Sequence, residues 1–280
     1  MGSDERTTRS ERLANDAREA AREVGSALAD ALGEDLEAVY LHGSGVLGGF
    51  RWDRSDLDIL ALSRTALSDR QFRQVVRALA PLAYPANGLE CSLMTAGEAS
   101  QPELPAPRFQ LHQTTDGWDR AGKVVDGRTR GGDPDLILHL AVCRALGVAI
   151  VGPPPRASLA VIPEETILSA MRDEVDWARE HAALEYLVLT SARAWLFVET
   201  HRIASKVEAG EWAAERYGEP GVIVASLARQ RGEGAEIVKD AAERLADRVE
   251  RLTRRRQLAT HPPTHAASRH RGGEPTVRCP

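Results

Sequence analysis

The chain has 280 residues, 42% of them hydrophobic, and a formal net charge of -5 at pH 7, so it can form a folded, soluble protein with a substantial core. No apolar run approaches the roughly 20 residues of a membrane span, and no apolar signal segment opens the chain, so we expect a cytoplasmic protein without a membrane partner. The acidic balance disfavours nucleic acid, because phosphate binding depends on clustered Lys and Arg, and it favours a cationic partner.

The first half of the chain alternates helical and strand-like patterns. Alanines, leucines and charges at helical spacing predict a first helix that ends at Gly33. Short apolar runs on either side of a glycine-rich turn predict two buried strands, and a helical pattern that begins at Asp69 leads to a third strand. The predicted elements are helices over 10–32 and 69–82 and strands over 38–41, 57–62 and 89–94.

The second half is predicted to be mostly helical. The stretch 97–133 is rich in Pro, Gly and Asp, and only its segment 108–112 resembles a strand. A helix with an Asp-Pro start is predicted over 133–147, and the prolines at 153–155 mark a boundary. The tail 257–280 has many breakers and few large apolar residues, so we expect it to be disordered. Further helices are predicted over 164–180, 183–200, 205–217, 221–231 and 236–256.

Two acidic residues interrupt the second strand. Asp56 and Asp58 are two apart, so on an extended strand both carboxylates lie on one face, where paired oxygen ligands can hold magnesium. The preceding turn contains Gly43, Ser44 and Gly45 and can bring backbone N–H groups close to a phosphate. Together they predict a site for a metal-bound triphosphate. The alternative is that Asp56 caps a turn and Asp58 makes a buried hydrogen bond.

A third carboxylate is predicted on the neighbouring strand. Alternation along 89–94 places Glu90 on the opposite face from Leu89, so Glu90 can converge with the first two acids. In a two-metal site such a carboxylate completes the ligand set, and it can also act as general base for a substrate hydroxyl. The alternative for Glu90 is a surface position on an edge strand.

An ordered set of motifs resembles a known family. The strings G-S-G-V-L-G-G-F and S-D-L-D-I-L resemble the signature of the polymerase-beta-type nucleotidyltransferases. L-E-C-S-L-M at 89–94, D-P-D-L-I-L at 133–138, L-T-S-A-R-A-W at 189–195 and I-A-S-K-V-E-A-G-E-W-A at 203–213 resemble the aminoglycoside adenylyltransferases that modify streptomycin and spectinomycin. The resemblance covers roughly residues 20 to 250.

The resemblance implies a role for each matching residue. Asp56, Asp58 and Glu90 would bind two magnesium ions, and Glu90 would also be the catalytic base. Arg193 is expected to be structural. A solvated helix start is the alternative for Lys206. The residues expected to bind the nucleotide are Gly43, Ser44, Ser55, Asp135 and Lys206.

The acceptor side departs from the family pattern. The family's G-E-W, whose Trp stacks on the antibiotic, is missing after Phe109 and Gln110, and the family's antibiotic-binding acid is replaced by Ala183. A substitute acidic wall with one aromatic would suit a polyamine sugar, although a solvated charged face is the alternative. The candidate substrate-binding residues are Asp173, Trp177, Glu180 and Glu185.

The sequence therefore predicts an α+β fold. A nucleotidyltransferase domain with a mixed sheet and flanking helices is expected over 1–155, and a helical substrate-binding bundle over 156–256. The expected reaction is magnesium-dependent transfer of AMP from ATP to a hydroxyl of a cationic antibiotic, with pyrophosphate released and resistance as the result, in a monomer. Three alternatives stay open: transfer to another cationic natural product, transfer to a protein or RNA, and nucleotide binding without transfer.

Overall fold

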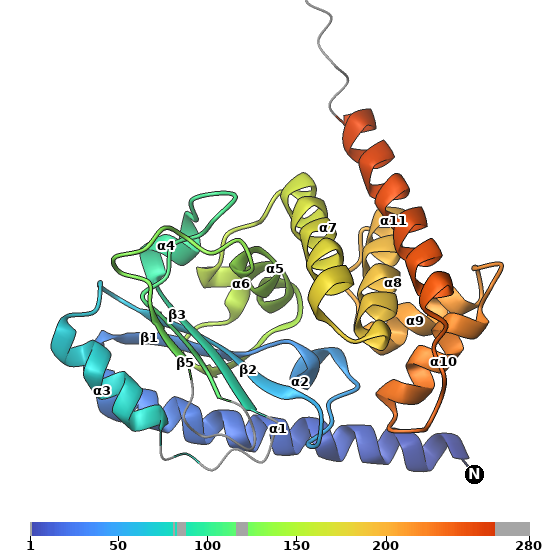
Figure 1. The fold of residues 1–280 in the computed structure, drawn as a ribbon. Helices are drawn as coiled ribbons and strands as arrows, with labels where there is room; N and C mark the ends of the chain where they lie inside the picture. The colour runs from blue at the N-terminus through green and yellow to red at the C-terminus, as the bar shows by residue number, and fades with distance from the viewer. Residues whose placement is uncertain (1, 81, 83–87, 116–122, 261–280) are drawn as a thin grey trace, which may run out of the picture.

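A six-stranded sheet and a set of C-terminal helices form the protein (Figure 1). The computed structural model describes residues 2–80, 82, 88–115 and 123–260. The mixed sheet with flanking helices, followed by a helical bundle, confirms the predicted α+β fold class. Residues 261–280, the main part of the tail that we predicted to be disordered, lie outside the described residues.

The sheet has the strand order β5-β4-β3-β2-β1-β6. β2 and β3 are parallel, while β1 pairs antiparallel with both β2 and β6, β3 with β4, and β4 with β5. The parallel pair is joined by helix α3, as a crossover between parallel strands requires. The strands are β1 Leu36–Leu41, β2 Asp56–Ser63, β3 Gly88–Thr95, β4 Leu111–Thr114, β5 Lys123–Asp126 and β6 Val148–Val151.

The two faces of the sheet bury different side chains, because successive strand residues point in opposite directions. Val39, Leu57 and Ile59 pack on one face under helices α1 (Gly2–Leu32) and α3 (Asp69–Leu79). Tyr40 and Leu60 pack on the other face with helix α5 (Leu136–Leu146). This second apolar cluster continues into the C-terminal helices, so the sheet and the bundle share one core.

The bundle is built around helix α8, which carries the longest run of buried residues among its helices. Helices α7, α9, α10 and α11 all contact it. Figure 1 shows these helices beside the sheet, with α5 and α6 (Pro155–Ser158) between them. The helices are α7 Glu164–His181, α8 Leu184–Thr200, α9 Lys206–Ala214, α10 Gly221–Gln230 and α11 Lys239–Thr260.

Several predicted boundaries differ from the structure. Strand β6 was not predicted, because its four residues follow helix α5 directly and are half-buried at the sheet edge. The strand expected over 108–112 runs instead over Leu111–Thr114, and the stretch 97–133 also contains β5 and most of α4 (Ala96–Ser100). Helix α1 begins earlier than predicted, and α11 continues to Thr260. Among the described helices none is long and apolar enough to cross a membrane.

Candidate active site

The pairing of neighbouring strands brings polar side chains into one row across the sheet. We call it the carboxylate row, after Asp56, Asp58 and Glu90. Asp58 of β2 is the direct partner of Glu90 in β3, and Glu90 is the partner of Thr114 in β4. On the other side His42 follows β1, and its N–H donates to the carbonyl oxygen of Asp58 at 3.0 Å. Directly paired residues share a face, so these side chains lie on the α5 side of the sheet. The predicted convergence of Glu90 with Asp58 therefore follows from the register.

Asp56 lies on the same face, one pair nearer the end of the strand. Its partner in β3 is Gly88. A Cβ at Gly88 would lie 1.8 Å from the carbonyl oxygen of Thr115 and 3.2 Å from Asp56 Oδ1. The position therefore requires glycine, because the Thr115 carbonyl group occupies the place of a side chain next to the Asp56 carboxylate.

The glycine-rich turn packs directly on Asp58. Gly43 has a φ of 57°, and a Cβ there would lie 1.9 Å from Asp58 Oδ2. Ser44 begins the short helix α2 (Ser44–Leu47), and its N–H donates to Asp58 Oδ2 at 3.3 Å. The predicted link between the turn and the carboxylates is thus a close contact between backbone and side chain, which only glycine permits.

The acids repel one another in this row. Desolvation, and then the charge of Glu90, raise the pKa of Asp58 to about 7. His139 and the N–H of Ser44 act in the opposite direction without cancelling the effect. A half-buried carboxyl group with so high a pKa lacks a sufficient positive partner, and a divalent cation would stabilise its charged form.

The donor set fits magnesium bound together with a nucleotide. Among the described residues, no three His, Cys, Asp or Glu side chains come together closely enough to enclose an ion by themselves. Magnesium in phosphoryl-transfer sites is usually held by one or two carboxylates, while substrate phosphates and water complete its coordination. Asp56 and Asp58 have that composition.

Two histidines that the sequence analysis did not consider border the row. His139, on α5, places Nε2 3.5 Å from Glu90 Oε1. Its ring contacts that of His42 at a centroid distance of 5.1 Å. Burial, and then the charge of His139, lower the pKa of His42 well below its usual value, so His42 is neutral. The spacing of Asp135 and His139, four residues apart on one helical face, is the sequence signal that could have indicated His139.

The bundle contributes a cationic group at this site. Lys206 begins α9, half-buried, and its Nζ lies 3.4 Å from the centroid of the Tyr186 ring. Burial, and then repulsion by Arg193, lower the pKa of Lys206 to about 8, while Asp58 and Asp56 act to raise it. Lys206 is therefore not a freely solvated helix start, and it lies within electrostatic range of the predicted metal ligands.

Arg193 belongs to a partly buried network beside Lys206. Its Nη2 donates to both carboxylate oxygens of Glu174, at 3.0 and 2.7 Å, and the Tyr186 hydroxyl donates to the same carboxylate at 2.9 Å. Burial opposes the charge on Glu174, but Arg193, Lys206 and Tyr186 together lower its pKa. The structural role predicted for Arg193 agrees with this network, whereas Glu174 and Tyr186 were not predicted at the site.

The two other residues predicted to bind the nucleotide are Ser55, whose hydroxyl already has a hydrogen-bond partner, and Asp135, which is exposed. The hydroxyl of the buried Ser55 accepts a hydrogen bond from the N–H of Arg51 at 3.0 Å. Asp135 is exposed at the start of α5; partial desolvation of its carboxyl group, and then the charge of Asp133, raise its pKa. The charge of Glu90 adds a smaller contribution to the same shift.

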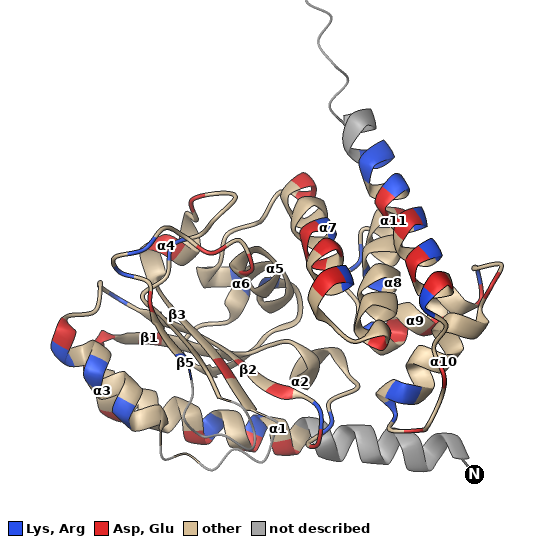
Figure 2. Ribbon diagram, in the orientation of Figure 1, with Lys and Arg blue, Asp and Glu red and all other residues tan. Residues whose placement is uncertain are grey.

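The predicted acceptor wall lies on α7, where Figure 2 shows a concentration of acidic positions. Asp173 and Glu180 are exposed, and Trp177 is 52% exposed. Trp177 stacks on His181 at 5.6 Å and meets Tyr186 edge-on at 6.1 Å, which links it to Lys206 through Tyr186. Glu185 is separate, because it pairs with Arg229 at 3.5 Å. Their role in binding remains a prediction.

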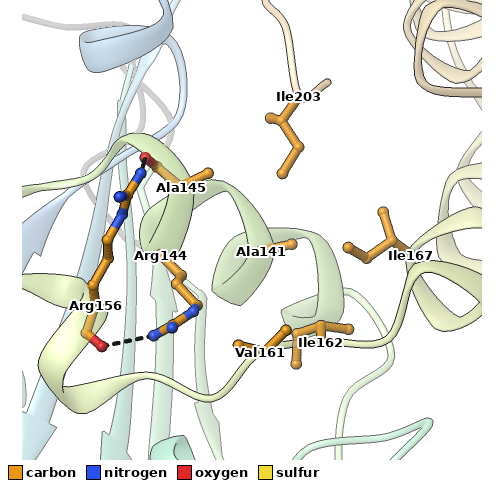
Figure 3. Close-up of a pocket in the computed structure, with 8 residues that line it drawn as sticks. All are labelled: Ala141, Arg144, Ala145, Arg156, Val161, Ile162, Ile167 and Ile203. Atoms are coloured by element: carbon orange, nitrogen blue, oxygen red, sulfur yellow. Dashed lines mark hydrogen bonds between the residues drawn. The ribbon is translucent and has the colours of Figure 1, made fainter. Parts of the chain in front are cut away.

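A hollow of about 320 Å³ lies elsewhere, beside the C-terminal part of α5 (Figure 3). Its polar groups are already engaged, since Arg144 donates to the carbonyl oxygens of Arg156 and Leu159, at 2.7 and 2.5 Å. It contains no acid or nucleophile, so the chemistry belongs to the carboxylate row. The lining residues are Ala141, Arg144, Ala145, Arg156, Val161, Ile162, Ile167 and Ile203.

Comparison with known proteins adds an independent observation. Residues 158–256 match the family model described as the C-terminal domain of aminoglycoside adenylyltransferase. The chain is 28% identical over 216 residues to spectinomycin 9-adenylyltransferase from Staphylococcus aureus. This alignment covers 73% of this chain and 81% of that protein. It is 28% identical over 230 residues to aminoglycoside (3'') (9) adenylyltransferase from Klebsiella pneumoniae, covering 78% and 83% of the two chains.

A solved structure has a similar fold. The spectinomycin adenyltransferase from Enterococcus faecialis, determined with ATP and spectinomycin, superposes with a TM-score of 0.67 at 19% identity. The match covers 84% of this chain and 98% of that one. The similarity therefore includes both the sheet and the helical bundle.

Proposed function

We propose that the chain belongs to the aminoglycoside adenylyltransferase family, whose C-terminal-domain model its residues 158–256 match, and that it transfers AMP from ATP to a hydroxyl of an aminoglycoside or aminocyclitol antibiotic of the streptomycin and spectinomycin type. Pyrophosphate is the other product, and resistance is the physiological result. The observation that carries the proposal is the register that aligns Asp58 with Glu90, beside a glycine turn that only glycine can form.

On the donor side, the chain's residues hold and polarise the nucleotide. Asp56 and Asp58 bind the magnesium that accompanies ATP, and Lys206 faces the triphosphate from the bundle. The hydroxyl groups of Ser44 and Ser55, the latter accepting from Arg51 N–H but still able to donate, are proposed to contact the phosphates beside Gly43, with Asp135 as a more exposed contact. Asp56, Asp58 and Glu90 would hold two magnesium ions, which would neutralise phosphate charge and polarise the phosphoryl group.

Glu90 acts on the acceptor. Its carboxylate takes the proton from the antibiotic hydroxyl while that oxygen forms a bond to the α-phosphorus of ATP. The bond from the α-phosphorus to the oxygen bridging to the β-phosphate breaks, and pyrophosphate leaves. Glu90 is also proposed as a metal ligand together with Asp56 and Asp58. Both of its proposed roles depend on its position as the direct partner of Asp58 in the strand register.

The bundle, residues 156–256, is proposed to bind the acceptor. Trp177 offers an exposed indole for stacking, with Asp173 and Glu180 on the same helical face to pair with ammonium groups. Glu185 is the least supported of these candidates, because Arg229 already neutralises it. Replacement of the family's antibiotic-binding acid by Ala183 makes another cationic natural product the second candidate acceptor.

The experiment that tests the function measures pyrophosphate release. Purified protein, ATP and magnesium are incubated with streptomycin, spectinomycin and a panel of other aminoglycosides. We expect turnover with at least one of them and an adenylylated product by mass spectrometry. If nucleotide binds but no drug in the panel is turned over, the antibiotic is the wrong acceptor and the search moves to other cationic compounds.

The role of Glu90 is tested by Glu90→Gln. Loss of the general base should lower kcat by roughly 10²- to 10⁴-fold, because Gln keeps the shape but cannot accept the proton. ATP binding should weaken little by comparison. The control is Glu103→Gln, at an exposed acid that pairs with Arg108 in a loop away from the row. Full activity in Glu90→Gln would show that another group is the base.

A further inference from the structure

The contact between Glu90 and His139 has no use in the proposed transfer. Glu90 Oε1 and His139 Nε2 are 3.5 Å apart, and the two side chains are 29% and 21% exposed. Hydrogen bonds between nitrogen and oxygen have donor–acceptor distances of about 2.7–3.2 Å. Two ligand atoms at about 2.0–2.2 Å from one shared ion lie roughly 3.0–3.5 Å apart. The observed separation is longer than a hydrogen bond and lies in the range both of an ion pair and of two ligands of one cation.

The surroundings of His139 also suit a ligand. Its ring packs against the ring of His42, which is 2% exposed and whose Nε2 has no hydrogen-bond partner within the described part of the chain. Neutral imidazole nitrogen is the form that binds metals. The cluster therefore holds two imidazoles beside the carboxylates, and the nitrogen nearest to an acid belongs to His139.

We propose that Glu90 and His139 bind the same divalent cation, so that this position accepts a transition-metal ion such as Co²⁺ or Zn²⁺ as well as Mg²⁺. The inference rests on the proposed function, because the remaining ligands are taken to be phosphate oxygens of the nucleotide and water. Imidazole favours zinc and other late first-row ions, whereas carboxylate and phosphate oxygens suit magnesium. His139 thus adds selectivity that a site made only of carboxylates lacks.

The test titrates Co²⁺ and Mg²⁺, separately and in competition, into the full-length protein with a non-hydrolysable ATP analogue. The variants are His139→Gln and His139→Leu. The matched control is His112→Gln, which removes a nearby imidazole that is already hydrogen-bonded to Ser92 Oγ at 2.9 Å. The spectroscopic readout is a solvent-exchangeable imidazole N–H proton resonance, shifted outside the normal range by bound Co²⁺.

We expect both His139 variants to lose at least about tenfold in Co²⁺ affinity and to keep Mg²⁺ affinity within about twofold. The shifted resonance should be present in the wild type and in His112→Gln, and absent without His139. The proposal is overturned if the wild type shows no such resonance, if the resonance persists in the His139 variants, or if the affinities for both metals fall equally. The wild-type spectrum decides even if a variant does not fold.

The metal result and the transfer result are independent. A protein that transfers no AMP to any drug, yet loses Co²⁺ selectively on replacement of His139, would overturn the proposed function and keep this inference. A protein that transfers AMP with unchanged metal selectivity in the His139 variants would keep the proposed function and overturn this inference.

Discussion

Some residues of the candidate active site lower the stability of the metal-free folded protein, and Asp58 is the clearest example. Desolvation and the charge of Glu90 raise its pKa to about 7, so the folded apo protein resists ionisation of a group that ionises freely when unfolded. Gly43 touches the same carboxylate, with no room for a side chain. Both residues therefore predict measurable effects of single substitutions.

Asp58→Asn should stabilise the metal-free protein, and more so at high pH. Below the pKa that Asp58 has in the unfolded chain, the folded and unfolded proteins both hold the proton, and Asp58 has no effect on stability. Between that pKa and about 7, only the folded protein retains the proton, so the free energy of unfolding falls as the pH rises. We expect the gain to be larger at about pH 8 than at about pH 5.5 by on the order of 1–2 kcal/mol, measured by denaturant unfolding in EDTA.

The same substitution should weaken metal binding and transfer together. The control is Asp53→Asn, at an exposed acid whose pKa is lowered by its hydrogen bond to Arg51, so no such gain is expected. A variant of Asp58 that showed no pH-dependent gain would mean that the carboxyl group is already neutralised in the apo protein.

Gly43→Ala and Gly48→Ala separate backbone strain from contact with Asp58. Both glycines have positive φ, 57° and 85°, so each substitution should cost about 1–3 kcal/mol in backbone strain. Only at Gly43 does the new Cβ meet Asp58, whereas at Gly48 nothing lies within 4 Å. Nucleotide affinity measured by calorimetry should fall at least about tenfold in Gly43→Ala and little in Gly48→Ala. Equal losses would point to strain alone.

At the scale of elements, helices α7 and α8 are held together beside Lys206 by a largely buried ion pair. Glu174 and Arg193 have side chains 18% and 17% exposed, so solvent screens them little. Removing one partner of a buried pair leaves the other charge uncompensated, which typically costs about 3–5 kcal/mol. The pair thus sets how closely α7 approaches α8 at the proposed acceptor site.

Glu174→Gln should therefore destabilise the protein by about 3–5 kcal/mol in denaturant unfolding. The double variant Glu174→Gln/Arg193→Met should cost less than the sum of the two single changes, because it leaves no unpaired charge. The control, Glu215→Gln, disrupts an exposed pair with Arg216 and should change stability by less than about 0.5 kcal/mol. Additive effects in the double variant would contradict the coupling.

At the scale of the whole molecule, the predicted domain boundary near residue 155 crosses a shared core. One apolar cluster contains Tyr40 and Leu60 of the sheet together with Trp195 and Leu245 of the bundle. The loop before β2 also reaches the bundle, where Arg54 Nη1 donates to the carbonyl oxygen of Arg229 at 2.7 Å. The proposed donor and acceptor halves are therefore joined both by a shared apolar core and by a polar contact between the loop and the bundle.

Calorimetric unfolding should accordingly show one cooperative transition, with equal calorimetric and van't Hoff enthalpies. The bundle alone, residues 156–260, should not unfold cooperatively, because the apolar side chains that pack against the sheet side would face water. Two resolved transitions in the full chain would show instead that the predicted domains are thermodynamically independent.

Much of the donor side could be predicted from the sequence, because its determinants are local. The spacing of Asp56 and Asp58 fixes their common face, the glycines that precede them define the turn, and periodicity identifies the strands and most helices. Glu90 was placed correctly on a neighbouring strand, and the parallel register then made it the partner of Asp58. Strand β6 escaped prediction, because four half-buried residues carry too short a pattern.

The tertiary structure alone decided which distant side chains meet. His139 reaches Glu90, Lys206 comes within range of Asp58, and Glu174 binds Arg193 only after α5 and the bundle pack on the sheet. No periodicity encodes such contacts, since they depend on packing between elements far apart in the chain. The sequence by itself therefore determined the fold class and the carboxylate motif, while packing determined the electrostatic environment in which those carboxylates act.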